Sequence, residues 1–174
     1  MDNGGDMPPA SVFLGLGSNL GDREAAIEGA LVRLAGRGFR PTLRSSLWLT
    51  APVGGPPQGF FLNAVAGGET ELAPEALLEA CLATEREMGR VRAERNGPRT
   101  IDVDVLLFGG ERRDAPGLVI PHPRLHERRF VLAPLAEIAP SLVHPVLGLS
   151  VRELLARCQD ASSVRLHARA EARS

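Results

Sequence analysis

The sequence predicts an α+β sandwich of ferredoxin-like type, with a mostly antiparallel sheet and helices packed on it. Two segments, 22–36 and 74–88, carry apolar residues at helical spacing, and short apolar runs typical of strands lie around them. The order strand, helix, strand, strand, helix, strand contains too few strand–helix–strand units for a doubly wound parallel sheet. At 174 residues the chain suffices for one domain with its own core.

The first strand and helix are expected near the N-terminus. Residues 1–10 are polar and rich in Gly and Pro, which predicts a flexible tail without a signal peptide. The apolar run 11–17 leads into glycines at 15, 17 and 21, a spacing one residue too long for a dinucleotide-binding loop. The acidic residue that such a loop needs about 20 positions later is also missing. We therefore expect a tight turn, followed by a helix from Asp22 to Gly36.

The middle of the chain predicts two strands, 39–50 and 60–67, joined by a loop rich in Gly and Pro. This loop, residues 51–59, offers little apolar material for a core, so we expect a lid or a binding loop. Asn63 lies within the second apolar run and must find hydrogen-bond partners there. The helix 74–88 that follows begins with Pro74 and ends at Gly89.

The C-terminal third predicts a short strand at 118–120 and helices at 130–138 and 151–158. Pro134 should either kink the first of these helices or mark its start. Beyond residue 164 the chain is polar, so we expect a single domain at 11–164 and a mobile tail at 165–174. Cys81 and Cys158 are isolated and lack metal-ligand spacing, which favours structural thiols in a reducing compartment.

Composition excludes several classes of function. The formal net charge is −1, which does not suggest attraction of the whole molecule to nucleic acid or anionic membranes. All 20 positions counted as Lys or Arg are arginine, so the lysine of a P-loop is absent. No apolar stretch is long enough for a transmembrane helix. We expect a cytoplasmic monomer that binds neither nucleic acid nor membrane.

The segment 95–108 is the strongest candidate for a functional site. Its Gly-Pro turn presents Arg99 and then opens into a strand, on which Ile101, Val103, Val105 and Leu107 should share one face. Asp102 and Asp104 should share the other face, about 7 Å apart. Two carboxylates beside an arginine could bind a metal ion and a phosphate together. The alternative is a half-exposed strand with solvent-facing aspartates, although the apolar residues at 106 and 108 on that face argue against it.

Arginines crowd the chain just before this strand, at positions 86, 90, 92, 95 and 99. A solvated basic surface, partly neutralised by acidic residues at 85, 87 and 94, would explain any one of them. It does not explain why the cluster leads directly into the aspartates. Arginine can bind phosphate with two parallel hydrogen bonds, so a phosphate-binding site is the more specific interpretation of this arginine cluster.

Several long motifs, in this order, resemble the 6-hydroxymethyl-7,8-dihydropterin pyrophosphokinase family of folate biosynthesis. The resemblance covers nearly the whole globular part, from residue 14 to about residue 155. The motifs are Leu-Gly-Leu-Gly-Ser-Asn-Leu-Gly at 14–21, Phe-Leu-Asn at 61–63, Gly-Arg-Val-Arg at 89–92, Arg-Asn-Gly-Pro-Arg-Thr-Ile-Asp-Val-Asp-Val-Leu at 95–106, and Ile-Pro-His-Pro-Arg-Leu-His-Glu-Arg-Arg-Phe at 120–130.

The resemblance implies transfer of the β,γ-pyrophosphoryl unit of ATP to the hydroxymethyl group of a reduced pterin, leaving AMP. It implies that Asp102 and Asp104 coordinate two Mg²⁺ ions that bridge the triphosphate of the co-substrate ATP, a role suited to carboxylate oxygens. Arg90 and Arg99 match the family's catalytic arginines, which would stabilise charge on the transferring phosphates.

The resemblance also implies the residues of two binding sites. Pterin binding is carried over to Thr50, Val53, Phe61, Asn63 and Phe130. ATP binding is carried over to Glu85, Arg92, His122 and Arg128. Taken singly, the two phenylalanines could be core residues and His122 a structural histidine. The loops 51–59 and 90–97 would act as lids that exclude water.

This chain departs from the family pattern at two positions. Asn96 stands where the family commonly has Trp, and Ala51 stands where it often has Pro. The first change bears on how the second lid closes, and the second bears on the mobility of the first lid. Neither touches the aspartates or arginines.

Two rival functions remain open. A metal-dependent phosphotransferase or hydrolase acting on another nucleotide-linked substrate would keep the aspartates but would not need Phe61, Asn63 and Phe130 as a set. A non-catalytic nucleotide- or pterin-binding module should have lost Asp102, Asp104 or Arg99, and all three are present.

Overall fold

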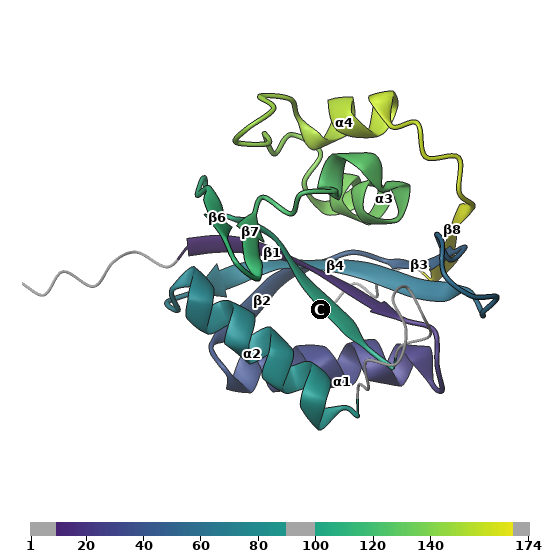
Figure 1. Cartoon of the computed structure of the whole chain (residues 1–174), viewed down its shortest axis with the longest axis horizontal. Coiled ribbons are helices and arrows are strands. Elements are labelled where there is room, and N and C mark those ends of the chain that lie inside the picture. The colour runs from purple at the N-terminus through teal and green to yellow at the C-terminus, as the bar shows by residue number, and fades with distance from the viewer. Residues whose placement is uncertain (1–9, 90–99, 169–174) are drawn as a thin grey trace, which may run out of the picture.

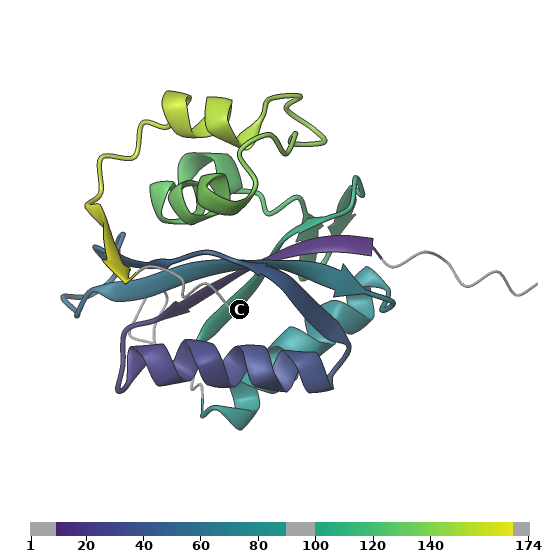
Figure 2. The ribbon, with the colours of Figure 1, turned by 180° about the vertical axis from the view of Figure 1, so that it is seen from behind.

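The computed structural model describes residues 10–89 and 100–168. Its elements are β1 (Ala10–Ser18), α1 (Arg23–Gly36), β2 (Phe39–Arg44), β3 (Leu47–Thr50), β4 (Phe61–Thr70), α2 (Pro74–Glu87), β5 (Asp102–Phe108), β6 (Arg113–Ala115), β7 (Leu118–Ile120), the 3-10 helix η1 (Leu125–Glu127), α3 (Arg129–Ile138), α4 (Val151–Arg157) and β8 (Val164–Ala168). Figure 1 shows three layers, with α1 and α2 on one face of the sheet and α3 and α4 on the other. The view from behind in Figure 2 shows the same layers. The predicted ferredoxin-like sandwich is confirmed.

The main sheet is antiparallel throughout. Its strands run in the order β5-β1-β4-β3-β8, and β2 also pairs with β4. Strands β2 and β3 pair with different parts of β4, β2 from position 66 to 70 and β3 from 61 to 63. With β2 and β3 counted as one interrupted strand, the four strands of the predicted ferredoxin-like core are therefore present, in the order expected of an antiparallel sandwich.

The expected strand 39–50 is interrupted at Ser45 and Ser46. Both serines are buried, and Ser45 exchanges two hydrogen bonds with Val65 of β4, each 2.9 Å long. The amide of Ser46 donates instead to the carboxylate of Glu137 on α3. Because these hydroxyl and carboxylate groups replace the strand ladder, the single strand becomes β2 and β3.

The C-terminal end of the described chain differs from the expected tail. Residues 165–168 belong to β8, which pairs antiparallel with β3. Pro134 lies inside α3 rather than at its start, because α3 begins at Arg129. The polar character of this last segment reflects an edge strand, whose outer face meets water, and not the absence of structure.

Two hydrophobic clusters lie on opposite faces of the sheet, one under α1 and α2 and one under α3 and α4. The predicted alternation along β5 holds only up to Val105. A bulge opposite Phe13 and Leu14 then shifts the register. Leu106 and Leu107 both pack in the cluster under α3 and α4, whereas Phe108 returns to the other cluster. The prediction that Leu107 shares a face with Val105 is therefore wrong.

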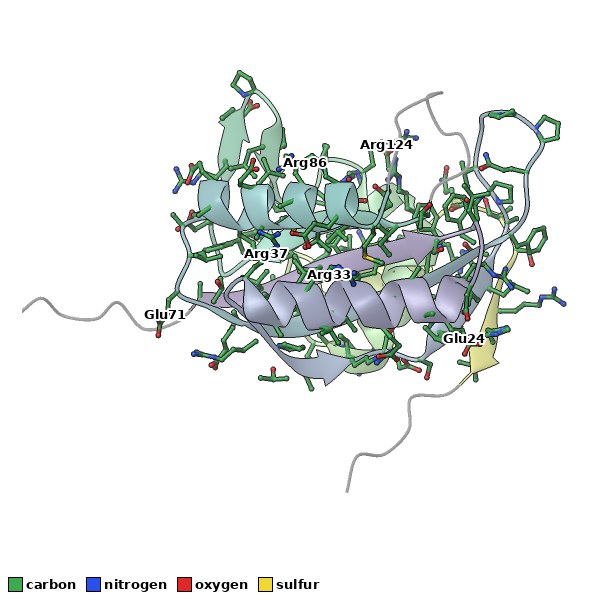
Figure 3. The ribbon with its side chains drawn as sticks, turned by 90° about the horizontal axis from the view of Figure 1, so that it is seen from below. Glu24, Arg33, Arg37, Glu71, Arg86 and Arg124 are labelled. Atoms are coloured by element: carbon green, nitrogen blue, oxygen red, sulfur yellow. The ribbon has the colours of Figure 1, made fainter. Side chains whose placement is uncertain are left out.

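Helices α1 and α2 run side by side beneath the sheet, as Figure 3 shows from below. Asp22 caps α1 by accepting a hydrogen bond of 3.0 Å from the amide of Ala25. Arg33 and Arg37 both pair with Glu87 at the end of α2. These pairs are partly exposed, so each contributes little to stability. None of the described helices is long and apolar enough to span a membrane.

Candidate active site

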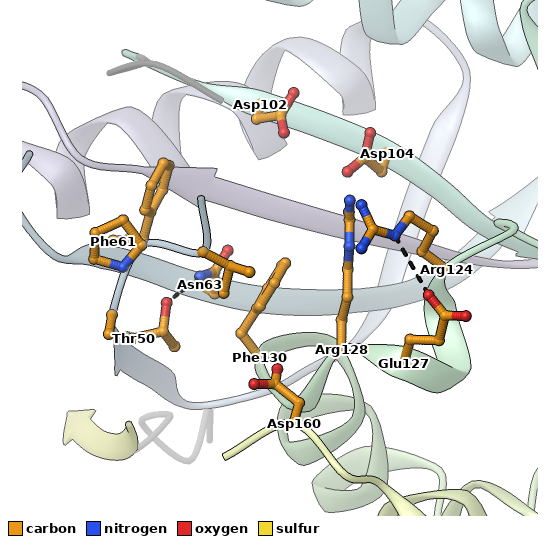
Figure 4. Close-up of a pocket in the computed structure, with 13 residues that line it drawn as sticks. Thr50, Phe61, Asn63, Asp102, Asp104, Arg124, Glu127, Arg128, Phe130 and Asp160 are labelled. Carbon is orange, nitrogen blue, oxygen red and sulfur yellow. Dashed lines mark hydrogen bonds and ion pairs between the residues drawn. The ribbon is translucent and has the colours of Figure 1, made fainter. Parts of the chain in front are cut away.

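A cavity of about 300 Å³ lies on the face of the sheet that also carries α3. It is lined by Thr50, Ala51, Pro52, Val53, Phe61, Asn63, Asp102, Asp104, Arg124, Glu127, Arg128, Phe130 and Asp160. Figure 4 shows the two aspartates on one side and Phe61, Asn63 and Thr50 on the other, with Phe130 below and between these groups and Arg128 below Asp104. The cavity thus brings together all five predicted pterin residues, both predicted metal ligands and one predicted ATP residue.

The two aspartates stand at the start of β5 and alternate with Val103, which is buried on the opposite face. Their partners on the neighbouring strand β1 are Gly17 and Gly15, which carry no side chains. Neighbouring side chains fill the space over both glycines, with Asn63 above Gly17 and Leu106 above Gly15. Among residues 10–89 and 100–168, no group of three or more His, Cys, Asp or Glu side chains could hold a metal by itself.

This donor set fits Mg²⁺ that is shared with a phosphate ligand. Magnesium commonly takes one or two protein carboxylates and completes its shell with water and substrate phosphates. Asp102 and Asp104 supply such a pair facing one cavity. A closed site built only from protein ligands, as in structural zinc sites, would need more donors than the described residues place there.

Asn63 is held by Thr50 at the other end of the cavity. Its Nδ2 donates a hydrogen bond of 2.6 Å to the hydroxyl of Thr50, which is itself buried. The amide oxygen lies over Gly17, since a Cβ built there would come within 2.5 Å of Asn63 Oδ1. The amide of Asn63 therefore has a defined orientation before any ligand binds, which suits recognition of a ligand edge that carries both donors and acceptors.

Two aromatic rings flank this amide. Phe61 comes from the first residue of β4 and Phe130 from the first turn of α3, and both are only partly buried. In Figure 4, Asn63 lies between the two rings. The guanidinium carbon of Arg128 lies 5.5 Å from the centre of the Phe130 ring, which is within cation–π range. Phe130 also packs against the hydrophobic cluster under α3 and α4, so its ring contacts both the core and the cavity.

Three charged cavity residues were not predicted from the sequence. Arg124 and Glu127 lie within the motif at 120–130 and form an ion pair of 3.4 Å. The arginines of that motif gave a signal that could have marked Arg124. Asp160 lies 31 residues beyond its partner Arg129, and no local pattern marks it. Only the folded chain brings Asp160 to the cavity.

Glu85 is a predicted ATP residue that does not line this cavity. It is buried on α2, and its Oε1 accepts a hydrogen bond of 3.0 Å from the amide of Val103. That amide lies between the two aspartates, so Glu85 supports the strand that carries them. Nearby, burial raises the pKa of the Cys81 thiol to about 12, and the carboxylates of Glu85 and Asp104 act in the same direction. Cys81 is therefore a protonated thiol at neutral pH.

His122 is the other predicted ATP residue that does not line the cavity. Two cavity residues, Arg128 and Asp102, nevertheless shift the pKa of its side chain. Burial and then the Arg128 guanidinium lower the pKa of its imidazole to about 4, although Asp102 opposes them. Its Nδ1 accepts a hydrogen bond of 3.2 Å from the amide of Arg124. The neutral ring therefore carries its proton on Nε2, from which it can donate to an anionic ligand.

The first expected lid has a defined structure. Gly54 and Gly55 both take positive φ angles of 72° and 74°, a conformation that suits glycine. At the far end of the loop, Asn19 Nδ2 donates to Gln58 Oε1 at 2.8 Å and to the carbonyl of Gly59 at 3.1 Å. The loop is thus anchored at its base beside the cavity, as a binding loop requires.

The remaining predicted residues lie outside the described part of the chain. These are Arg90, Arg92 and Arg99, together with the second expected lid at 90–97 and Asn96. Of the arginine cluster, Arg86 is described, and it pairs with Glu79 at 2.7 Å on the exposed side of α2. For Arg86 the interpretation as a solvated surface charge is therefore the better one.

Comparisons with known proteins agree with this geometry. Curated relatives named 2-amino-4-hydroxy-6-hydroxymethyldihydropteridine pyrophosphokinase include those of Methylorubrum extorquens, at 50% identity over 83% of this chain and 91% of that protein, and of Pseudomonas aeruginosa, at 45% over 84% and 91%. The solved structure of wild-type Plasmodium falciparum HPPK-DHPS shares the fold, with a TM-score of 0.67 at 14% identity. That match covers 86% of this chain and 44% of the Plasmodium chain, so this chain spans less than half of that protein.

The family model also matches the part of the chain that builds the site. Residues 13–140 match the model described as 7,8-dihydro-6-hydroxymethylpterin-pyrophosphokinase (HPPK). Twelve of the thirteen cavity residues fall within this range, and Asp160 lies beyond it. The chain therefore belongs to the 7,8-dihydro-6-hydroxymethylpterin-pyrophosphokinase family.

Proposed function

We propose that this chain transfers the β,γ-pyrophosphoryl unit of ATP to the hydroxymethyl group of 6-hydroxymethyl-7,8-dihydropterin and releases AMP. Its family identifies it as a pyrophosphokinase of folate biosynthesis. The observation that carries the finer assignment is the cavity itself, in which a slot between two aromatic rings adjoins a pair of carboxylates.

The pterin half of the cavity suits a flat heteroaromatic ring. Phe61 and Phe130 would stack on its faces, and the amide of Asn63, oriented by Thr50, would read its edge of donors and acceptors. This set favours the pyrophosphokinase over the rival phosphotransferase, which has no use for an amide between two partly exposed rings that line a cavity. Val53 and the rest of the loop 51–59 would then cover the ring and exclude water.

The phosphate half of the cavity suits a magnesium-bound triphosphate. Asp102 and Asp104 would hold two Mg²⁺ ions, which when bound neutralise the triphosphate and polarise the attacking hydroxyl. Arg128, and Arg99 with Arg90, would bind the phosphate oxygens and stabilise the charge that develops on them. His122 would donate from Nε2 to a phosphate, and Arg92 and Glu85 would complete ATP binding. Positioning and electrostatics supply most of the catalysis, so no covalent nucleophile is needed.

The decisive experiment mixes the protein with ATP, Mg²⁺ and the reduced hydroxymethyl pterin and separates the nucleotide products. AMP is expected. ADP would mean transfer of a single phosphoryl group and would overturn the proposed reaction. Formation of AMP that does not depend on the pterin would indicate a hydrolase instead.

Substitution of the carboxylates tests the metal assignment. Asp102→Ala and Asp104→Ala should each lower kcat at least about a hundredfold, since each loses several kcal/mol of charge stabilisation. Neither side chain packs in a core, so stability should change by no more than about 1 kcal/mol. Asp114→Ala, on the exposed strand β6, is the matched control and should retain full activity. Wild-type turnover by either site variant would refute the assignment.

A further inference from the structure

The C-terminal segment, residues 158–168, joins the two walls of the pterin half of the cavity. On one side, β8 pairs with β3, and the amide of Ala51 donates a hydrogen bond of 3.0 Å to the carbonyl of Ser163. On the other side, the side chain of Arg129 donates to the carbonyls of Asp160 at 2.8 Å and of Cys158 at 3.1 Å. This segment lies beyond the residues that match the family model.

The contact with α3 is made at the turn of the helix that carries the cavity residues. Helix α3 has no side-chain cap at its own N-cap position, Arg128. The carboxylate of Asp160, a residue far along the chain, caps the helix instead, because its Oδ2 accepts a hydrogen bond of 3.1 Å from the amide of Arg129. A negative charge at this end of a helix also interacts favourably with the helix dipole. The first turn of α3 is thus held from outside the helix.

The carboxylate is itself fixed in place. Its Oδ1 accepts from the amide of Ser162 at 2.9 Å and from the hydroxyl of the same residue. Burial alone would raise the pKa of the Asp160 carboxyl, but the hydrogen bonds from Ser162 and Arg129 outweigh it and hold the pKa below its usual value. Asp160 is therefore ionised at neutral pH, with both oxygens engaged by the protein.

Arg129, the residue that Asp160 holds, stands between two cavity residues. Arg128 precedes it and Phe130 follows it, and Figure 4 shows Asp160 below the point where the Phe130 side chain leaves α3. The ring of Phe130 is attached to the helix by a short side chain, so its place depends on the first turn of α3. The side chain of Arg128 is long and flexible, so it can still extend into the cavity when that turn loosens. A change at Asp160 should therefore act on the ring first.

We propose that Asp160 is a positioning residue that sets the place of Phe130 and so the width of the pterin slot. This inference rests on the proposed function, because it names the pterin as the ligand whose affinity depends on Asp160. It assigns a role in substrate recognition to a segment outside the residues that match the family model.

The test compares Asp160→Ala with a matched control in the same layer. Ser150→Ala removes the capping box of α4, and Ser150 does not line the cavity. For Asp160→Ala we expect the KM for the pterin to rise about tenfold, because a hydrogen bond to a charged group is lost. The KM for ATP should rise less than about threefold. Ser150→Ala should lower the thermal midpoint similarly and change neither KM.

A double variant decides whether Asp160 acts through the ring. If it does, Asp160→Ala should add almost nothing to the KM for the pterin in a Phe130→Ala background. Fully additive effects, equal rises in both KM values, or a KM for the pterin equal to that of Ser150→Ala would each overturn the inference while leaving the proposed function standing. Absence of AMP formation by the wild-type protein would overturn the proposed function and this inference with it.

Discussion

Gly17 lies beneath the amide of Asn63, and replacing it with alanine is the most direct test of how the slot is built. The Cβ of Gly17→Ala would stand 2.5 Å from Asn63 Oδ1, whereas real Cβ contacts are essentially never shorter than 3.0 Å. The amide must therefore move away from Gly17 by at least about 0.5 Å. Because this oxygen is the end of a side chain and Gly17 has no positive φ, the fold itself can accommodate the change.

Gly17→Ala should weaken pterin binding and leave the stability of the fold almost unchanged. A displacement of this size disturbs the 2.6 Å bond from Asn63 to Thr50 and misplaces the amide against the pterin edge. Loss of one buried hydrogen bond costs about 0.5–1.5 kcal/mol, so the KM for the pterin should rise by roughly two- to tenfold. The KM for ATP should stay within about twofold, and the free energy of unfolding within about 1 kcal/mol.

Gly15→Ala provides a matched control on the same face of the same strand. Its Cβ would meet the side chain of Leu106 at 3.5 Å, which is ordinary van der Waals contact, so both KM values should remain those of the wild type. Steady-state kinetics with each substrate varied in turn, together with thermal unfolding, measure these quantities. A KM for the pterin equal in Gly17→Ala and Gly15→Ala would refute the reasoning. So would a full effect of Gly17→Ala in a background that already carries Asn63→Ala.

Two further predictions concern stability. The pKa of His122 is lowered from 6.5 to about 4 in the folded protein, so between these pH values the unfolded chain binds more protons than the folded one. The free energy of unfolding of the wild type should therefore fall by about 1–3 kcal/mol, after allowance for solvent screening, as the pH falls from about 6.5 to about 4. His122→Gln, which keeps an acceptor for the Arg124 amide, should lack this loss in urea titrations, and parallel curves for both proteins would contradict the prediction. Glu85→Ala should destabilise the fold by about 2–3 kcal/mol, because it leaves the buried amide of Val103 without its acceptor. Glu79→Ala, on the exposed side of the same helix, should change stability by less than about 0.5 kcal/mol, and equal effects of the two would count against a structural role for Glu85.

Local patterns predicted most of the elements and the placement of the two aspartates. Alternation along the chain placed Asp102 and Asp104 on one face of a strand, and helical periodicity located α1 and α2 within one or two residues. Asn63 stood out as one polar residue in an apolar run. These inferences succeed because a strand or helix repeats its geometry over a few residues, so that a side chain's direction follows from its position.

Features that depend on distant partners escaped prediction. The bulge at Leu106 follows from pairing with β1, and the break at Ser45 and Ser46 follows from contacts with β4 and α3. Residues 165–168 look like a polar tail because an edge strand exposes one side to water. Their pairing with β3 has no local signature.

The sequence by itself therefore determined the four α-helices and most of the strands, the pair of carboxylates, the lack of a P-loop lysine and, through its motifs, the family. Only the tertiary structure decided that Glu85 supports the aspartate strand from the opposite face, and that Asp160 reaches the first turn of α3. The physical reason is the same in both cases. A hydrogen bond between residues far apart in the chain depends on where folding brings their backbones, and no spacing within a single element records that position.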